Sequence, residues 1–178
     1  MVQGKKLIIF TDIGDTIIDE TTEIRKIPHG IVYKANCIPG AKETYLKLFE
    51  LGYTIAMVAD GYVESFENTM EQNGLSHIFS VKSISETVGV EKPEASMFET
   101  AFQLLRLKEE DKKRIIMVGN RLERDVVGAK RFGITSVHLA WSKRYKTEPE
   151  CQEEKPDYQI QNPEELLELV EKLEQQLS

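Results

Sequence analysis

The stretch "IIFTDIGDTIIDE", residues 8–20, joins a short apolar run to a turn that carries two aspartates. An apolar run that ends in polar turn residues is typical of a strand buried on both faces, so a strand is expected over Lys6–Asp12. Asp12 stands at the carboxyl end of this strand, and Gly14 and Asp15 follow it in the turn. A buried strand that presents carboxylates at a tight turn predicts a functional site there.

Strand and helix patterns alternate along the rest of the chain. Further strands are expected within 53–61, 79–85, 114–120, 134–141 and 156–160, and helices within 38–53, 62–74, 93–107, 121–133 and 162–177. This alternation predicts an α/β fold, a three-layer α/β/α sandwich with a mostly parallel sheet and right-handed crossovers. The length of 178 residues suits a single domain over 1–178.

Apolar periodicity predicts which faces of the helices turn inward. The expected core positions are Ala41, Tyr45, Leu48 and Phe49 in the first helix and Met97, Ala101, Leu104 and Leu105 in the third. Asn162 is expected to cap the last helix, with Pro163 at its first position and Glu165 three residues after the cap.

Composition argues against several functional classes. The net charge of -7 and a pI near 5.1 disfavour general attraction to nucleic acid or an anionic membrane. No apolar run approaches the roughly 18 residues that cross a bilayer, and the first residues lack a signal-peptide pattern. Cys37 and Cys151 are far apart and His29, His77 and His138 are scattered, so neither a disulfide framework nor a zinc site is expected. A reducing cytoplasm is the expected compartment.

Chemically active residues follow several expected strands and precede one helix. In an open parallel sheet, ligands bind beyond the carboxyl ends of the strands, where the strand order reverses. The residues expected there are Asp12, Gly14, Asp15 and Thr16 after the first strand, Asp60 and Gly61 after the second, Lys92 before the third helix, and Gly119, Asn120 and Asp125 after the fourth strand. Carboxylates, a lysine and glycine turns in one crevice predict a hard cation together with an anionic substrate.

These four motifs, in this order, resemble those of the haloacid dehalogenase (HAD) superfamily, most of whose members transfer phosphoryl groups through an aspartyl-phosphate. The resemblance runs from Lys6 to the last helix and implies a Rossmann-like fold. It implies that Asp12 is the nucleophile and a Mg²⁺ ligand, that the Gly14 carbonyl is a second ligand, and that Thr16 braces the loop. A carboxylate that attacks phosphorus forms a mixed anhydride that water can later cleave.

The first motif departs from the family pattern at Gly14. Family phosphatases usually carry an acid two residues after the nucleophile and then a glycine, whereas this chain has Gly14 and then Asp15. That acid protonates the leaving alcohol and then activates water, a role typically worth 10²–10⁴-fold. Two interpretations stay open: Asp15 replaces the acid through a re-shaped loop, or it stabilises the turn by hydrogen bonds to the backbone.

The second motif is altered and the third is kept. Where the family supplies a hydroxyl to the phosphate, the chain has Ala59, followed by Asp60, whose charge would repel a phosphate. The N–H of Gly61 is a candidate anion donor, with a plain strand-end turn as the alternative. Lys92, before a helix that begins with Pro93, matches the third motif and is expected to neutralise the phosphate and the nucleophile.

The fourth motif has lost one carboxylate. Asn120 stands where the family often has a metal-binding aspartate, and Asp125 keeps the second acid. An amide oxygen ligates Mg²⁺ without adding charge, so the resemblance implies a weaker magnesium site formed by Asp12, Gly14, Asn120 and Asp125. A surface pair between Asp125 and a neighbouring arginine is the alternative.

The segment after the first strand is too short for a cap domain. About twenty residues separate Thr16 from the next expected helix. The chain therefore resembles a capless member, with 17–37 as a flap on which Arg25, Lys26 and His29 are candidates to meet an anion. An open site suits a phosphoprotein, or a phosphorylated small molecule covered by a neighbouring subunit, so a homo-oligomer is one expected assembly.

The stretch "SKRYKTEPECQEEKP", residues 142–156, is polar and is expected to form a surface loop. Trp141, Arg144 and Tyr145 at its start are candidates for substrate contact, with packing as the alternative.

The motifs support three functional hypotheses. The favoured one is a Mg²⁺-dependent phosphatase that forms an aspartyl-phosphate on Asp12. Because Gly14 removes the usual acid, it would prefer aryl and acyl phosphates, whose leaving groups need little protonation. The second is a catalytically silent relative that binds a ligand or partner in the same crevice, as the altered positions 14, 59, 60 and 120 suggest. The third keeps the covalent aspartate but attacks carbon or a carbon–phosphorus substrate.

Overall fold

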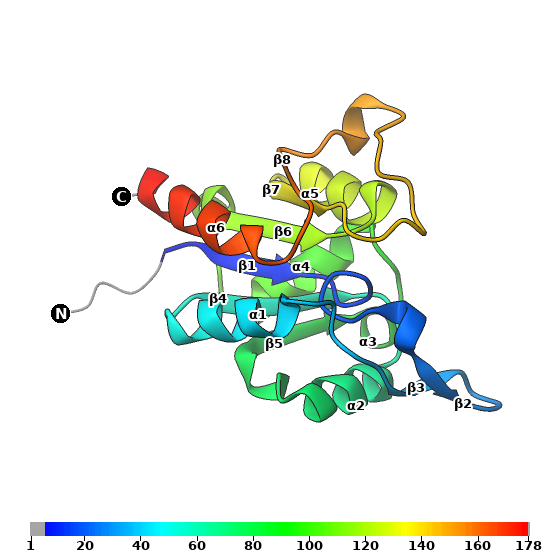
Figure 1. Ribbon diagram of the computed structural model, residues 1–178. Helices are drawn as coiled ribbons and strands as arrows, with labels where there is room; N and C mark the ends of the chain where they lie inside the picture. Colours follow the sequence, from blue (N-terminus) through cyan, green and yellow to red (C-terminus); the bar gives the residue numbers. More distant parts are fainter. Residues whose placement is uncertain (1–5, 178) are drawn as a thin grey trace.

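The computed structural model describes residues 6–177, and its centre is a six-stranded sheet whose neighbouring strands all run parallel (Figure 1). The strand order is β5-β4-β1-β6-β7-β8. The strands are β1 (Ile8–Thr11), β4 (Thr54–Ala59), β5 (Phe79–Ile84), β6 (Ile115–Gly119), β7 (Thr135–Leu139) and β8 (Tyr158–Ile160). The predicted α/β sandwich is confirmed, including the short strand at the sheet edge, which is β8.

Helices cover both faces of this sheet. They are α1 (Ala41–Glu50), α2 (Val63–Asn73), α3 (Ser85–Val88), α4 (Ala95–Leu104), α5 (Val127–Phe132) and α6 (Glu165–Gln176). Buried residues of α1, α2 and α6 share one core with Ile9, and those of α4 and α5 share the other with Ile8 and Phe10. Figure 1 shows α1 and α6 lying across the near face of the sheet. Because successive residues of β1 enter opposite cores, the strand is apolar without interruption.

The position of β1 decides where a ligand can bind. Phe10 of β1 is paired with Ala56 of β4 on one side and with Met117 of β6 on the other. The chain therefore goes from β1 to β4 and β5 on one side, and later returns past β1 to β6. A reversal of strand order at this point opens a crevice at the carboxyl ends of the strands.

Two helix faces differ from the prediction. Phe49 is 40% exposed and Leu104 is 54% exposed, so neither belongs to the core. In α4, Phe98 and Phe102 are buried beside the expected Met97 and Ala101. The buried face of α4 thus also includes the residues that follow Met97 and Ala101. The two phenylalanine rings fill the space over the sheet better than Leu104, at the helix end, does.

Between β1 and α1 the chain forms a 3₁₀ turn, Glu20–Thr22, and an antiparallel hairpin of β2 (Ile24–Lys26) and β3 (Ile31–Lys34). This hairpin occupies the flap expected over 17–37, although its strands were not predicted. The N–H of Val32 donates to Ser65 Oγ at 2.9 Å, and Asn68 Nδ2 donates to the Val32 carbonyl at 3.1 Å. The hairpin therefore rests on α2 and extends past the sheet (Figure 1).

The remaining regular turns are short. Further 3₁₀ turns cover Ser76–Ile78, Glu109–Arg114 and Gln152–Glu154, and a π-helical turn, Leu122–Val126, precedes α5. The expected cap of the last helix is wrong, because α6 begins at Glu165 and its N-cap is Glu164, without a side-chain cap hydrogen bond. Glu165 Oε1 does accept from the main-chain N–H of Asn162 at 3.0 Å. Over residues 6–177, no helix combines the length and apolarity needed to cross a bilayer.

Candidate active site

A cavity of about 260 Å³ opens at the carboxyl ends of the central strands. Asp12, Lys92, Asn120 and Asp125 all line it. Asp12 comes directly after β1, Asn120 and Asp125 follow β6, and Lys92 precedes α4. The structure therefore brings together four of the residues that the sequence placed in one crevice, as the shared edge of parallel strands requires.

Lys92 is the centre of this group. Its Nζ lies 2.8 Å from Asp12 Oδ1 and 2.7 Å from Asp125 Oδ1, and it donates to the Val58 carbonyl at 2.8 Å. The Lys92 side chain is 1% exposed. A buried ammonium is tolerated only where acceptors surround it, and here two carboxylates and a carbonyl do so.

Burial and charge shift both groups of the central pair. Burial raises the pKa of Asp12 to about 7 against the opposing effect of Lys92, while Asp125 and Asp60 add to the rise. Burial disfavours the ammonium of Lys92, but the three carboxylates outweigh it, so the pKa of Lys92 is raised. Lys92 is therefore a permanent cation, and the ionisation of Asp12 depends on the positive charge around it.

The second oxygen of Asp12 faces a different set of atoms. The side-chain oxygen of Asn120 faces Asp12 Oδ2 and the Gly14 carbonyl, and turning the amide over lets its nitrogen donate to them at 3.1 and 3.2 Å. Three oxygens around one point repel one another, and the amide nitrogen faces only donors, so the turned amide satisfies both of its ends. With the amide oxygen toward this point instead, a cation would have to lie between the three oxygens. A carboxylate, a carbonyl and an amide oxygen are the donors that Mg²⁺ prefers, so these residues fit the ion.

The carboxylates near this point are few. Within residues 6–177, no cluster of three or more His, Cys, Asp or Glu side chains is arranged to hold a metal. The oxygens that face one another here are one carboxylate oxygen, of Asp12, and the neutral oxygens of Gly14 and Asn120. The weaker magnesium site expected from the loss of an aspartate at 120 stays a prediction.

Asp125 is held in the site by the loop after β6. Its side chain is 1% exposed, and Oδ2 accepts from the main-chain N–H of Arg121 at 3.0 Å. A Cβ on Gly119 would overlap the Asp125 carboxyl group, so only glycine permits this approach. The alternative of a surface pair between Asp125 and an arginine is wrong, because its partners are the buried Lys92 and a backbone N–H.

Asp60, directly after β4, connects the loop that carries Lys92 with Arg124. Its Oδ1 accepts from the main-chain N–H of Lys92 at 3.0 Å, and its Oδ2 pairs with Arg124 at 3.2 Å. The N–H of Gly61 donates to Ser85 Oγ at 2.8 Å. Both residues line the cavity, but anion binding by Gly61 stays a prediction that requires this hydrogen bond to exchange.

Asp15 turns away from the cavity. The residue is fully buried with a φ of 48°, and its side chain is not among those that line the cavity. Its Oδ1 accepts from the main-chain N–H of Glu20 at 2.9 Å, and its Oδ2 pairs with Arg144 at 2.6 Å. This arrangement favours the turn-stabilising interpretation. Thr16 Oγ1 donates to the Gly14 carbonyl at 3.4 Å, as expected for a residue that braces the loop.

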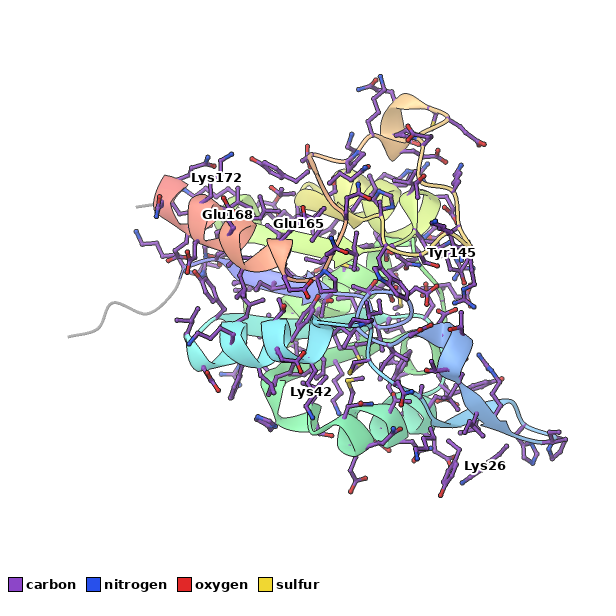
Figure 2. All side chains as sticks on the ribbon, viewed as in Figure 1. Lys26, Lys42, Tyr145, Glu165, Glu168 and Lys172 are labelled. Atoms are coloured by element: carbon purple, nitrogen blue, oxygen red, sulfur yellow. The ribbon has the colours of Figure 1, made fainter. Side chains whose placement is uncertain are left out.

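The flap reaches the cavity with fewer residues than expected. Arg25 lines it, together with Glu23 and Val32. Lys26 pairs with Glu64 at 3.6 Å, and its side chain is 54% exposed. Figure 2 shows Lys26 at the lower edge of the molecule. His29 is exposed in the hairpin turn. Of the three basic residues proposed to meet an anion, Arg25 is thus the one placed at the cavity.

The loop after β7 contributes to the site from far along the chain. Tyr145 lines the cavity and its ring stacks on the guanidinium of Arg121 at 4.1 Å, while Arg144 reaches Asp15. Figure 2 shows Tyr145 on the same side of the molecule as the hairpin. The surface loop expected over 142–156 is therefore also a wall of the site. Trp141 packs against the core instead.

Glu20 is one of several lining residues, with Glu23 and Val32, to which sequence reasoning gave no role. It lies in the quoted stretch "IIFTDIGDTIIDE", but it was given no role because no periodicity marks the loop that carries it. Its carboxylate accepts from Arg144 at 2.8 Å and from the Tyr145 hydroxyl at 3.1 Å. The sequence did contain one indication of such a residue, because glycine at position 14 has no side chain and leaves space for another one.

The comparisons with known proteins agree with this geometry. Residues 8–139 match the family model of haloacid dehalogenase-like hydrolases. The glyceraldehyde 3-phosphate phosphatase of Methanopyrus kandleri is 33% identical over 135 residues, which are 76% of this chain and 57% of that protein. The protein of the same name in Pyrococcus furiosus is 33% identical over 136 residues, with shares of 76% and 55%. The chain thus spans slightly more than half the length of these curated relatives.

Solved structures are similar in fold. A HAD phosphatase from Thermococcus onnurineus has a TM-score of 0.74 at 19% identity, covering 92% of this chain and 97% of that one. YfnB from Bacillus subtilis, bound to magnesium in its crystal, has a TM-score of 0.66 at 22% identity, with shares of 76% and 56%. The family match spans well over half of the chain and the fold agrees with it, so this protein belongs to the haloacid dehalogenase-like hydrolase family.

Proposed function

We propose that this protein is a magnesium-dependent phosphatase that forms an aspartyl-phosphate on Asp12. The observation that carries the proposal is the Asp12 carboxylate, which lies 2.8 Å from the buried ammonium of Lys92 inside a cavity. Relatives that are 33% identical and named phosphatases support the same reaction class.

The residues present can carry out the first half of the reaction. An oxygen of Asp12 attacks the substrate phosphorus, and the bond from phosphorus to the leaving oxygen breaks with its electron pair on that oxygen. Lys92 offsets the negative charge of the nucleophile and of the phosphoryl group, which would otherwise repel each other. Its contact with Asp125 holds the ammonium at this position.

The same oxygens would hold Mg²⁺. Asp12, the Gly14 carbonyl and the amide oxygen of Asn120 form the candidate ligand set, with Asp125 beside it. When bound, the ion would offset charge on the phosphoryl oxygens. It would also favour the charged form of Asp12, whose pKa burial raises to about 7.

The cavity favours a phosphorylated small molecule over a phosphoprotein. Its volume of about 260 Å³ lies just below the roughly 300–1,000 Å³ of drug-sized ligand sites. With no acid at Gly14, we expect aryl and acyl phosphates to react faster than alkyl phosphates, because their leaving groups need less protonation. A single domain, a homo-oligomer and a cytoplasmic location remain proposals. Free thiols at Cys37 and Cys151 suit the last.

The test compares wild type with Asp12→Asn in Mg²⁺, on p-nitrophenyl phosphate, acetyl phosphate and glycerol phosphate. Asp12→Asn should lose turnover, and a chelator should remove it from wild type until Mg²⁺ is restored. Asp111→Asn, in the 3₁₀ turn that leads into the amino end of β6 and thus at the end of the strand opposite the cavity, should keep the wild-type rate. Full activity in Asp12→Asn would refute the aspartyl-phosphate, and equal rates on aryl and alkyl substrates would refute the preference.

A silent relative that only binds a ligand is the second candidate. Two observations favour this candidate: the Gly61 N–H already donates to Ser85 Oγ, and Ala59 has no hydroxyl. Each removes a hydrogen-bond donor that a phosphate would use. This candidate predicts no turnover in wild type but a saturable chemical shift change or heat signal on adding inorganic phosphate or a phosphate ester.

A further inference from the structure

The carboxylate of Glu20 occupies the space that a side chain at position 14 would fill. Glu20 is the first residue of the 3₁₀ turn Glu20–Thr22, which Asp19 caps by accepting from the Thr21 N–H. A Cβ added to Gly14 would overlap Glu20 Oε1, and it would lie 2.9 Å from Cδ and 3.3 Å from Cγ of the same residue. The chain therefore places the carboxylate of Glu20 beside Gly14, which lies two residues after Asp12.

Three contacts hold Glu20 there. Its main-chain N–H donates to Asp15 Oδ1 at 2.9 Å. Its Oε2 accepts from Arg144 at 2.8 Å and from the Tyr145 hydroxyl at 3.1 Å. Because these donors both reach Oε2, the other oxygen is left on the Gly14 side. Glu20 lines the same cavity as Asp12.

The second half of the proposed reaction requires a proton acceptor at this place. Water can cleave an aspartyl-phosphate only if its proton is taken up as its oxygen bonds to phosphorus, and a positioned base typically contributes 10²–10⁴-fold. Asp12 carries the phosphoryl group at that stage. Asp125 and Asp60 are occupied by Lys92, by Arg124 and by backbone N–H groups.

We propose that Glu20 is the general base that hydrolyses the phosphorylated form of Asp12, an inference that rests on the phosphatase proposed above. The water oxygen forms a bond to phosphorus while its proton moves to Glu20 Oε1. The bond from phosphorus to the Asp12 oxygen breaks, and its electron pair returns to the Asp12 carboxylate. Inorganic phosphate leaves, and Glu20 then returns the proton to solvent. Arg144 and Tyr145 are positioning residues for this step.

The test is pre-steady-state hydrolysis of p-nitrophenyl phosphate by Glu20→Gln. Glutamine keeps the size of the side chain and an acceptor for Arg144, but it cannot take the proton. We expect steady-state turnover to fall by about 10²–10⁴-fold. A first burst of p-nitrophenolate should remain, and intact-protein mass spectrometry should show a phosphoryl adduct that Asp12→Asn lacks. Glu153→Gln is the matched control, because this exposed glutamate also pairs with an arginine, Arg131 at 2.8 Å, and it should behave as wild type.

The outcomes separate this inference from the phosphatase proposal. If wild type hydrolyses the ester through Asp12 but Glu20→Gln keeps its turnover, or loses the burst together with the turnover, the role of Glu20 is overturned and the phosphatase stands. If turnover does not depend on Asp12, both fall. Should Glu20→Gln not fold, Glu20→Gly combined with Gly14→Asp moves the carboxylate to position 14. Recovery of turnover relative to Glu20→Gly would support a base, and no recovery would overturn it.

Discussion

Replacing Lys92 with methionine should destabilise the protein strongly. Methionine matches the length of the lysine side chain but carries no charge. It would leave Asp12 and Asp125 facing each other without the ammonium that now lies 2.8 and 2.7 Å from their oxygens. The Val58 carbonyl would lose its donor as well. The perturbation therefore removes one member of a buried ionic group and keeps the others.

The expected cost follows from burial. The side chains of Lys92 and Asp125 are each 1% exposed and that of Asp12 is 12% exposed. Water can therefore do little to solvate the two carboxylates once the ammonium is gone. Breaking a buried pair from one side typically costs about 3–5 kcal/mol, because a charge is left without compensation. Against a typical stability of about 5–15 kcal/mol, Lys92→Met should lose a large share of the free energy of unfolding.

Urea unfolding in the presence of a chelator measures this cost. Lys172→Met is the matched control, since Lys172 lies exposed on α6 (Figure 2) and should change stability by less than about 0.5 kcal/mol. Adding Asp12→Asn to Lys92→Met should recover about 1–3 kcal/mol more than the same change gains with Lys92 in place, because one of the carboxylates left without the ammonium is removed. A loss from Lys92→Met no larger than that of the control, or strictly additive single and double variants, would show that the ammonium does not compensate these carboxylates.

The other predictions concern the same site. The pKa of Asp12 is raised from 3.8 to about 7, so the contribution of this group to stability is lost as pH rises from 4 to 7. In chelator, Asp12→Asn should be more stable by about 1–3 kcal/mol at pH 8 and should lose this gain near pH 4, as measured by urea unfolding. Arg144→Ala leaves the buried Asp15 carboxylate without its cation and should lower the free energy of unfolding by about 1–2 kcal/mol. This loss is smaller than for a fully buried pair, because the Arg144 side chain is 40% exposed. Adding Asp15→Asn should recover part of the lost stability. Gly119→Ala displaces Asp125 and should lower turnover of p-nitrophenyl phosphate at least about tenfold, with an unchanged circular dichroism spectrum.

Opposite results would identify the faulty step. A stability gain in Asp12→Asn that is the same at pH 4 and pH 8 would mean that burial does not disfavour the Asp12 charge. Unchanged stability in Arg144→Ala would mean that solvent or another cation reaches Asp15. Wild-type turnover in Gly119→Ala would mean that the position of Asp125 is not needed for the reaction.

Much of the fold follows from local patterns that a reader can see in the chain. Uninterrupted apolar runs, turn residues and helical periodicity predicted the order of strands and helices, and the alternation predicted a parallel sheet. Once the sheet is parallel, the carboxyl ends of its strands meet. Asp12, Asn120 and Asp125 therefore converge in the structure as the sequence had indicated, with Lys92 at the start of the next helix pattern.

Details that depend on distant parts of the chain could not be predicted. Periodicity reports which face of one element is apolar, but it does not report which rings fill the space opposite, so Phe98 and Phe102 were missed and Leu104 was wrongly placed in the core. The hairpin strands β2 and β3 were hidden because their side chains are largely exposed and alternate without a clear period.

The sequence by itself determined that Asp12, after the first strand, would lie near Lys92 and Asp125. The reason is that the carboxyl ends of parallel strands lie on the same side of the sheet. Only the tertiary structure decided which acid lies beside Gly14. Arg144, 129 residues away from Asp15, draws that carboxylate out of the cavity and holds Glu20 beside Gly14. Such ion pairs form between loops that chain packing brings together, and neither loop carries a local pattern that names its partner.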